Sequence, residues 1–155
     1  MCGGSWRTEW AMEADLCAWL DRAGCPTWRQ VPILGRCADL VARWPDGALW
    51  AIEVKLRGPA RGAAQAARYL LAADYALVAL PQEPRNLAAL KAHGLGLLVP
   101  DAGALARAGG AWRLAIPPRP SRRRFGPAAG WLQERIAARP PGLPTRGGEP
   151  WLTDR

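Results

Sequence analysis

The hydrophobic positions of the chain follow a helical period at first and then the shorter patterns of strands. Apolar side chains at helical spacing predict a helix over residues 8–23, with Thr8 as its N-cap and Gly24 just beyond its end. A short strand is predicted over residues 27–33, and Gly35 leads from it into the next element. The N-terminal part of the chain therefore predicts one helix followed by the start of a sheet.

Two apolar runs on either side of Pro45-Asp46-Gly47 predict a β-hairpin. Proline, aspartate and glycine in close succession are typical of a tight turn. If these three residues form the loop, Trp44 pairs with Ala48 across the hairpin. The same register then places Asp39 opposite Glu53.

Charged side chains gather on one face of this hairpin. Side chains alternate along a strand, so Glu53 and Lys55 share a face, while Ile52 and Val54 point to the other. Directly opposed Cβ atoms lie about 4.5–5.5 Å apart, where like charges destabilise the pair. A divalent cation held by Asp39 and Glu53 would offset this repulsion, since Mg²⁺ takes oxygen ligands. Beside such a site, Lys55 would orient or activate a water, or stabilise charge on a phosphoryl group.

Helix and strand signals alternate after the hairpin. The Ala-rich segment 60–73 predicts a helix, and residues 86–93 predict a shorter one. Residues 74–80 and 95–99 are mainly apolar runs that end at proline, as expected for strands buried on both faces. A helix that crosses between two such strands implies parallel pairing with a right-handed connection. A last strand over residues 111–116 is expected at the edge of the sheet.

The length of 155 residues favours one folded domain with a substantial core. We expect that domain to span residues 1–116. The Pro- and Arg-rich residues 117–155 form an extension, partly disordered, in which residues 128–139 fit one amphipathic helix. No apolar run approaches the ~20 residues of a membrane span. The N-terminus lacks the pattern of a secretion signal, so a cytoplasmic location is expected and no membrane partner.

Zinc binding and nucleoside triphosphate hydrolysis find no support in the sequence. The chain has one histidine, His93, and its four cysteines show no Cys-x-x-Cys spacing. A phosphate-cradling glycine loop followed by Lys-Ser or Lys-Thr is also missing.

The positive charge favours a polyanionic partner. Eight arginines and three acidic residues fall in residues 117–155, which therefore carry +5 of the formal net charge of +8. Basic residues bind nucleic acid through counterion release, without sequence preference.

The segment from Asp39 to Lys55 resembles the active-site motif of the PD-(D/E)xK nuclease superfamily. That motif is an acidic residue followed, on the next strand, by Asp or Glu, any residue and Lys. Asp39 matches the first acid, and Glu53-Val54-Lys55 matches the triplet. The resemblance implies an α/β, restriction-endonuclease-like three-layer core with a mixed sheet, flanking helices and the element order α-β-β-β-α-β. It also implies a Mg²⁺ or Mn²⁺ cofactor bound by Asp39, Glu53 and the backbone carbonyl of Val54.

Two helices add to this resemblance, which covers residues 9 to about 100. Members of the superfamily often carry a glutamate on the helix before the sheet, where it completes the metal site. Glu13 is the better match and Glu9 the alternative. Gln65 and Tyr69 lie four residues apart on one face of the next helix. This pattern resembles a motif of the exonuclease-like branch, which implies that both residues support the site and Tyr69 also the nucleic-acid strand.

Further nucleic-acid contacts are expected from arginines near the motif and in the extension, because arginine binds phosphate. These arginines are Arg57, Arg61, Arg68, Arg122, Arg123 and Arg124. Bases can also stack on exposed indoles, for which Trp28, Trp44 and Trp112 are candidates, although most of the nine tryptophans are expected to pack in the core.

The sequence therefore predicts a metal-dependent nuclease that hydrolyses phosphodiester bonds in DNA rather than RNA. Two alternatives stay open. One is a nucleic-acid-binding or assembly protein that uses the same fold without catalysis. The other is an unrelated small α/β domain whose hairpin carboxylates are merely solvated. Because the chain is close to a minimal core, a second copy of itself or a partner subunit is a further expectation.

Overall fold

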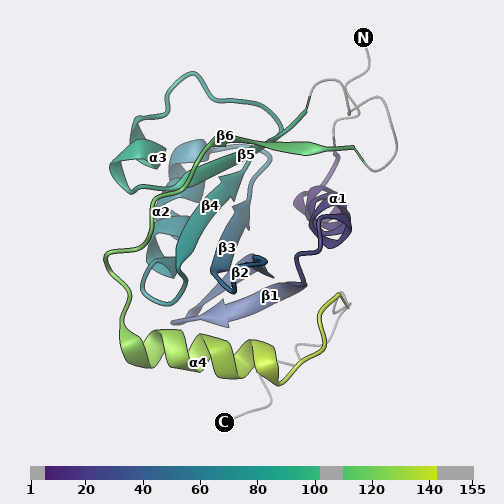
Figure 1. The fold of residues 1–155 in the computed structure, drawn as a ribbon. Helices are drawn as coiled ribbons and strands as arrows, with labels where there is room; N and C mark the ends of the chain where they lie inside the picture. Colours follow the sequence, from purple (N-terminus) through teal and green to yellow (C-terminus); the bar gives the residue numbers. More distant parts are fainter. Residues whose placement is uncertain (1–5, 102–109, 143–155) are drawn as a thin grey trace.

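A computed structural model describes residues 6–101 and 110–142. In these residues, strands form one mixed sheet in the order β1-β2-β3-β4-β5-β6, with helices on both sides (Figure 1). The strands are β1 (Thr27–Ile33), β2 (Arg36–Arg43), β3 (Leu49–Val54), β4 (Tyr75–Ala79), β5 (Gly96–Pro100) and β6 (Trp112–Ile116). The helices are α1 (Glu9–Arg22), α2 (Pro59–Tyr69), α3 (Ala88–Ala92) and α4 (Gly126–Ala137). The predicted α/β class and the order α-β-β-β-α-β are confirmed.

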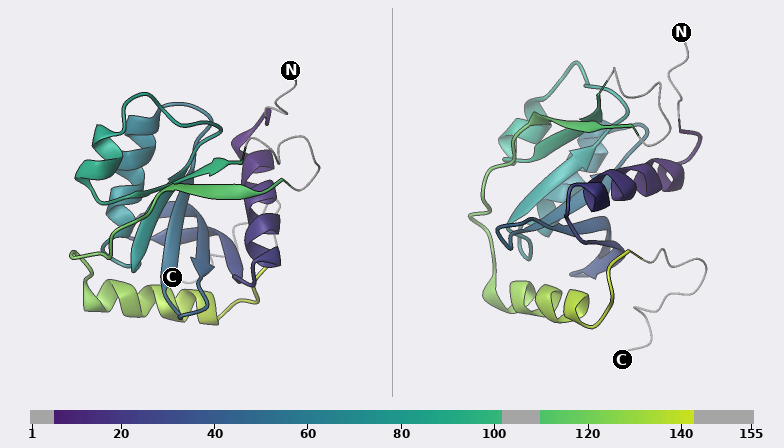
Figure 2. Two further views of the ribbon diagram at one scale, coloured as in Figure 1. Left: turned by 45° about the horizontal axis from the view of Figure 1, so that its top comes forward. Right: turned by 45° about the vertical axis from the view of Figure 1, so that its right-hand side comes forward.

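The sheet separates two hydrophobic clusters, so the molecule has three layers (Figure 2). Helix α1 covers one face with Met12, Leu16 and Leu20, which are completely buried. Helices α2, α3 and α4 line the other face. Each strand residue of the hairpin therefore points either toward α1 or toward α2.

Helix α1 begins where its sequence predicts. The Oγ1 atom of Thr8 accepts a hydrogen bond from the backbone N–H of Ala11 at 3.1 Å, which satisfies one of the free donors of the first turn. Gly24 follows the helix with φ of 76°, a conformation that glycine adopts without steric cost.

The hairpin between β2 and β3 has the predicted register. Its turn is closed by a hydrogen bond of 2.9 Å from the Trp44 N–H to the Ala48 carbonyl, and Gly47 takes φ of 88°. The antiparallel pairing then runs to Leu40 opposite Ile52. Continuing this register by one residue puts Asp39 opposite Glu53, and the backbone N–H of Val54, the last residue of β3, donates to Asp39. Turn chemistry therefore determines which side chains face each other at the far end of the hairpin.

The later strands also pair as predicted. Strand β4 is parallel to β3 and to β5, and β6 adds to the edge, antiparallel to β5. Helix α2 connects β3 to β4, so the carboxyl ends of β3, β4 and β5 lie at the same edge of the sheet.

Two helices are shorter than predicted. Helix α2 ends at Tyr69 instead of residue 73, because the following residues form tighter turns that bring Leu70, Ala72 and Ala73 into the core. Helix α3 begins at Ala88, after Asn86, whose side-chain oxygen accepts the Ala88 N–H at 2.9 Å.

None of the helices in the described part of the chain has the length and hydrophobicity needed to cross a membrane.

The predicted C-terminal extension contributes a helix to the core. Backbone hydrogen bonds join Ser121 to Asp74 at 2.8 Å and Phe125 to Leu71 at 2.8 Å, so the basic segment lies along the domain. Helix α4 then packs on the sheet beside β1 with its buried residues Ala128, Ala129, Leu132 and Ile136 (Figure 1). The part of the extension beyond residue 142 lies outside the described residues.

Candidate active site

Three carboxylates from three different elements approach one another at the sheet. Glu13 comes from α1, Asp39 from β2 and Glu53 from β3. Glu13 and Glu53 are each only 2% exposed, and Asp39 is half-buried. Burying a charge without a partner is costly, so the contacts of these groups determine what the site can bind.

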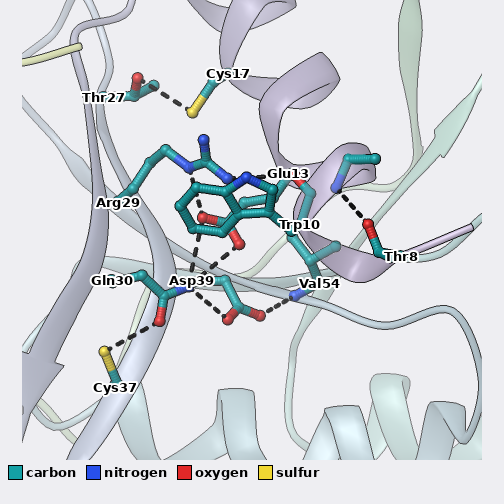
Figure 3. Close-up of polar contacts among 11 residues, drawn as sticks. Thr8, Trp10, Glu13, Cys17, Thr27, Arg29, Gln30, Cys37, Asp39 and Val54 are labelled. Carbon is teal, nitrogen blue, oxygen red and sulfur yellow. Dashed lines mark hydrogen bonds and ion pairs between the residues drawn. The ribbon is translucent and has the colours of Figure 1, made fainter. Parts of the chain in front are cut away.

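Glu13 is held by two neighbouring residues of β1 (Figure 3). The Arg29 Nε–H donates to Glu13 Oε1 at 2.7 Å, and the Gln30 amide donates to Glu13 Oε2 at 3.2 Å. Adjacent residues of a regular strand point to opposite faces. Gln30 has φ of 53°, which breaks this alternation and lets both side chains reach Glu13. Burial raises the pKa of Glu13, and the charge and hydrogen bond of Arg29 oppose that rise.

Asp39 contacts neutral donors. Its Oδ2 accepts the backbone N–H of Val54 at 2.7 Å, and its Oδ1 accepts the Gln30 amide at 3.3 Å (Figure 3). Gln30 therefore bridges Asp39 to Glu13. Burial, followed by the negative charge of Glu53, raises the pKa of Asp39 to about 7. A cation near Asp39 would stabilise its charged form.

Glu53 is held by Lys55 and Tyr69. The Lys55 ammonium lies 2.8 Å from Glu53 Oε1, and the Tyr69 hydroxyl donates to Glu53 Oε2 at 2.5 Å. Burial works to lower the pKa of Lys55, but its hydrogen bond to Glu53 and the charges of Glu53 and Glu9 raise it. Burial and the hydrogen bond to Glu53 raise the pKa of Tyr69. Lys55 therefore remains a cation and Tyr69 a neutral donor.

Glu9, the alternative to Glu13, also reaches this site. Its Oε2 lies 3.8 Å from the Lys55 ammonium, and its Oε1 accepts the Leu56 N–H at 3.3 Å. The side chain of Glu9 is 46% exposed, in contrast to the buried Glu13. The two glutamates of α1 thus lie at different depths, with Glu13 linked to Asp39 and Glu9 linked to Lys55.

Helix α2 presents one face to Lys55 and Glu53. Gly62 lies so close that a Cβ atom there would meet Lys55 Cγ at 3.0 Å and Val78 Cγ1 at 3.2 Å. Gln65 lies one turn further on the same face, followed by Tyr69 after one more turn. The Oε1 atom of Gln65 is buried and has no hydrogen-bond partner among the described residues. A buried acceptor of this kind needs a donor, such as a bound water or a ligand group.

The burial of Tyr69 revises one predicted role. Its ring is 1% exposed, and its hydroxyl oxygen also lies 3.0 Å from the Cys37 carbonyl oxygen. The ring has no free surface on which a nucleotide could stack. Tyr69 can support the site through Glu53.

The charges of the site fit a divalent cation bound by few protein ligands. The carboxylates of Glu9, Glu13, Asp39 and Glu53 face the two cations Arg29 and Lys55, so carboxylates outnumber cations by two when Asp39 is ionised. Within residues 6–101 and 110–142, no group of three or more His, Cys, Asp or Glu side chains is arranged to hold a metal ion. Mg²⁺ is usually held by one or two carboxylates together with water and substrate phosphate, a set that Asp39 and Glu53 can supply. The contact made by the Val54 backbone uses its N–H, so its carbonyl as a ligand stays a prediction.

The predicted arginines divide into two groups. Arg57 and Arg61 are exposed close to the carboxyl end of β3, where Lys55 lies, and Arg68 is exposed further along α2. Arg124 instead forms an ion pair of 2.9 Å with Asp74, whose other oxygen accepts the Leu49 N–H at the opposite end of β3. The four steps along the strand from Leu49 to Glu53 correspond to about 13 Å, so Arg124 lies away from the carboxylates. Arg122 and Arg123, also exposed, adjoin Arg124.

Arg29, Gln30 and Trp10 belong to the site although their sequence pattern did not indicate it. The available signal was an arginine within the mainly apolar strand over residues 27–33, because a buried guanidinium needs a carboxylate partner. No feature of the neighbouring sequence indicates the positive φ of Gln30. Trp10 lies over the Arg29 guanidinium, whose Cζ is 3.6 Å from the ring centroid.

Comparisons with known proteins show the fold and leave the activity open. The sequence matches no protein-family model, and the curated proteins contain no match to it. A solved structure, SPO1766 from Silicibacter pomeroyi, is similar with a TM-score of 0.59 and 20% sequence identity. The similarity covers 81% of this chain and 80% of the other, which is described as a protein of unknown function. At this identity the likeness shows a shared α/β fold.

Proposed function

We propose that the protein is a Mg²⁺- or Mn²⁺-dependent phosphodiesterase of the PD-(D/E)xK type that hydrolyses DNA. The observation that carries the proposal is the arrangement at the end of the β2–β3 hairpin. There Asp39 and Glu53 approach each other from neighbouring strands, and Lys55 donates to Glu53 at 2.8 Å. Supporting this assignment are the restriction-endonuclease-like element order and the position of Glu13 behind Asp39.

Each of the two carboxylates that would bind the cation is held by its own hydrogen-bond partners. Glu53 is fixed by Lys55 and Tyr69, and Asp39 is fixed by the Val54 N–H and by Gln30. Their orientation is therefore set before any ligand binds, which lowers the cost of binding. When bound, the cation would polarise the scissile phosphate and lower the pKa of a coordinated water.

Glu13 acts through its neighbours in this proposal. Its carboxylate is engaged by Arg29 and Gln30, so it positions Gln30, which in turn donates to Asp39. It also adds negative charge near Asp39, which favours a cation there.

Lys55 supplies positive charge to the reacting phosphate. The side chain of Lys55 is 16% exposed, so solvent reaches it while its ammonium is held by Glu53. Since Glu53 keeps Lys55 protonated, we assign it to charge stabilisation and to orienting the attacking water. Gln65, with its unpartnered oxygen, would accept a hydrogen bond from that water. Arg57 and Arg61 would contact flanking phosphates.

Metal titration and cleavage of labelled DNA test this proposal together. Calorimetry should show Mn²⁺ binding to the wild type that is lost in Asp39→Ala. Lys55→Gln should retain Mn²⁺ binding while cleavage falls on the order of 100-fold or more, the usual effect of removing a charge-stabilising donor. Lys91→Gln is the matched control, because Lys91 is exposed on α3, away from the carboxylates.

The outcomes separate the two functions that the sequence left open. Cleavage of single-stranded, duplex or branched DNA that requires both Asp39 and Lys55 supports the enzyme. If the wild type binds DNA but cleaves none of these substrates with either metal, the protein is a binding or assembly protein instead. Unchanged Mn²⁺ binding in Asp39→Ala would remove the proposed metal site.

A further inference from the structure

Trp10 is a partly exposed indole beside the carboxylates. Its relative exposure is 38%, and it is the one tryptophan among the exposed large hydrophobic residues in the described part of the chain. It lies three residues before Glu13 on α1, so the two side chains are neighbours on the helix surface. Figure 3 shows the indole beside Glu13 and Arg29, with Asp39 nearby. The residue before it, Glu9, reaches Lys55.

The indole is held in place by Arg29. The Arg29 guanidinium stacks on the ring at 3.6 Å from its centroid, and an Arg29 Nη atom donates to the Trp10 carbonyl at 3.3 Å. Arg29 is itself fixed by Glu13, and its side chain is only 6% exposed. The cation covers one ring face, so the exposed area belongs to the remaining ring surface. A rigid aromatic ring loses little conformational freedom when a ligand stacks on it.

The tryptophans predicted for base stacking are unsuited to it. Trp28 is 7% exposed and Trp112 is 4% exposed. Trp44 stacks on Trp50 with a centroid distance of 3.8 Å and an interplanar angle of 2°. Trp44 is partly exposed, but it lies at the hairpin turn beside the Leu49 end of β3, away from the carboxylates, whereas Trp10 is both exposed and beside them.

An exposed aromatic face binds bases that are themselves unstacked. In a continuous duplex both faces of each base are covered by neighbouring pairs, whereas single strands and unpaired ends offer a free face. We propose that Trp10 stacks on a base next to the phosphate that Lys55 and the cation proposed at Asp39 and Glu53 would bind. The preferred substrate class is then DNA with an unpaired nucleotide at the site, such as a single strand or a strand end. This inference rests on the proposed nuclease function for the identity of the ligand.

Binding of labelled DNA with Ca²⁺ in place of Mg²⁺ or Mn²⁺ tests the inference, because Ca²⁺ takes carboxylate oxygens as ligands and keeps the site occupied, and each probe is checked for cleavage after the titration. The probes are an oligo-dT strand and a blunt, closed hairpin duplex, followed by fluorescence anisotropy. Trp10→Leu should bind the strand about 5- to 150-fold more weakly, the effect of losing one stacked base, and should bind the hairpin with little change. Trp10→Phe should recover most of the affinity. Phe125→Ala is the matched control, because Phe125 is an aromatic residue with 58% exposure that precedes α4.

A second measurement keeps the test independent of how well Trp10→Leu folds. A 2-aminopurine placed in turn along the strand should be quenched by stacking at one position when the wild type binds, and Trp10→Phe should weaken the quenching. Equal losses for strand and hairpin, or no quenching at any position, would overturn the inference. These outcomes are distinct from failure of the proposed function, in which strand binding depends on Trp10 while no DNA is cleaved with Mg²⁺ or Mn²⁺.

Discussion

At the scale of single residues, Asp39 differs from the other two buried carboxylates. Glu13 has Arg29 and Glu53 has Lys55, whereas the contacts of Asp39 are to the Val54 N–H and the Gln30 amide. The charge of Asp39 is therefore the least compensated of the three. A proton or a bound cation would relieve the same electrostatic cost, so the two should compete.

This competition predicts how stability depends on pH in the metal-free protein. The pKa of Asp39 in the folded state, about 7, lies above the ordinary value of 3.8, so the folded state binds the proton more tightly. The contribution of Asp39 is therefore most favourable below about pH 4, and it is lost as the pH rises through 7. Asp39→Asn removes the buried charge and should raise the free energy of unfolding at pH 8 by roughly 2–4 kcal/mol relative to wild type.

Urea unfolding with a chelator at pH 5 and pH 8 measures this effect. The gain from Asp39→Asn should be clearly smaller at pH 5 than at pH 8. Asp101→Asn is the control, because Asp101 is exposed and should change stability little at either pH. A gain independent of pH would show that the charge of Asp39 is not the cause.

At the scale of elements, the close approach of α2 to β3 positions Lys55. Gly62 leaves room for the stem of Lys55, and Tyr69 on the same helix donates to Glu53. The helix therefore fixes both members of the Lys55–Glu53 pair. A change of packing at this contact should affect the site more than the stability of the fold.

Gly62→Ala tests that contact. The new methyl group would meet Lys55 Cγ at 3.0 Å and Val78 Cγ1 at 3.2 Å, so Lys55 must shift. Alanine stabilises a helix by about 1 kcal/mol relative to glycine, which offsets part of the cost of overpacking, about 1–3 kcal/mol. We expect a small loss of stability with a cleavage rate that falls about tenfold or more, measured by thermal unfolding and DNA cleavage.

Gly130→Ala on α4 is the matched control. A Cβ atom at Gly130 meets nothing within 4 Å, so this variant should gain about 1 kcal/mol of stability and keep its activity. If Gly62→Ala also keeps full activity, the position of Lys55 does not depend on this contact.

The elements themselves were largely predictable from local sequence. Thr8 caps α1, and Pro45-Asp46-Gly47 closes the hairpin, as their types predict. The C-terminal end of α2 was not predictable, because an Ala-rich segment has a high helix propensity throughout. Burial of Leu70 and Ala73 in the core, a non-local effect, ends the helix early.

At the scale of the whole molecule, α4 joins the C-terminal segment to the sheet. Leu132 and Ile136 are completely buried in the cluster that also contains Trp28 and Tyr69. The indole N–H of Trp28 donates to the Arg139 carbonyl at 3.0 Å, and Arg43 donates to Gln133 at 3.2 Å. The helix therefore shares its core with the strands that carry the site.

This shared core predicts a single cooperative unfolding transition. Leu132→Ala should lower the free energy of unfolding by about 2–5 kcal/mol, the usual cost of a cavity in a core, and should shift the whole transition. Circular dichroism and tryptophan fluorescence during urea unfolding measure it, with the exposed Glu134→Ala as control. A separate early transition that involves α4 alone would contradict the prediction.

Local sequence alone determined which residues of the hairpin face each other and on which side of the strand Lys55 lies. Turn residues and the two-residue period of a strand act over a few positions, so they specify the register that brings Asp39 to Glu53. Tertiary structure alone decided that Arg29 and Gln30 hold Glu13, that Trp10 lies over Arg29, and that Arg124 lies at the far end of β3. These contacts join segments that are distant in the chain, and they arise because buried charges must find partners once the core has packed.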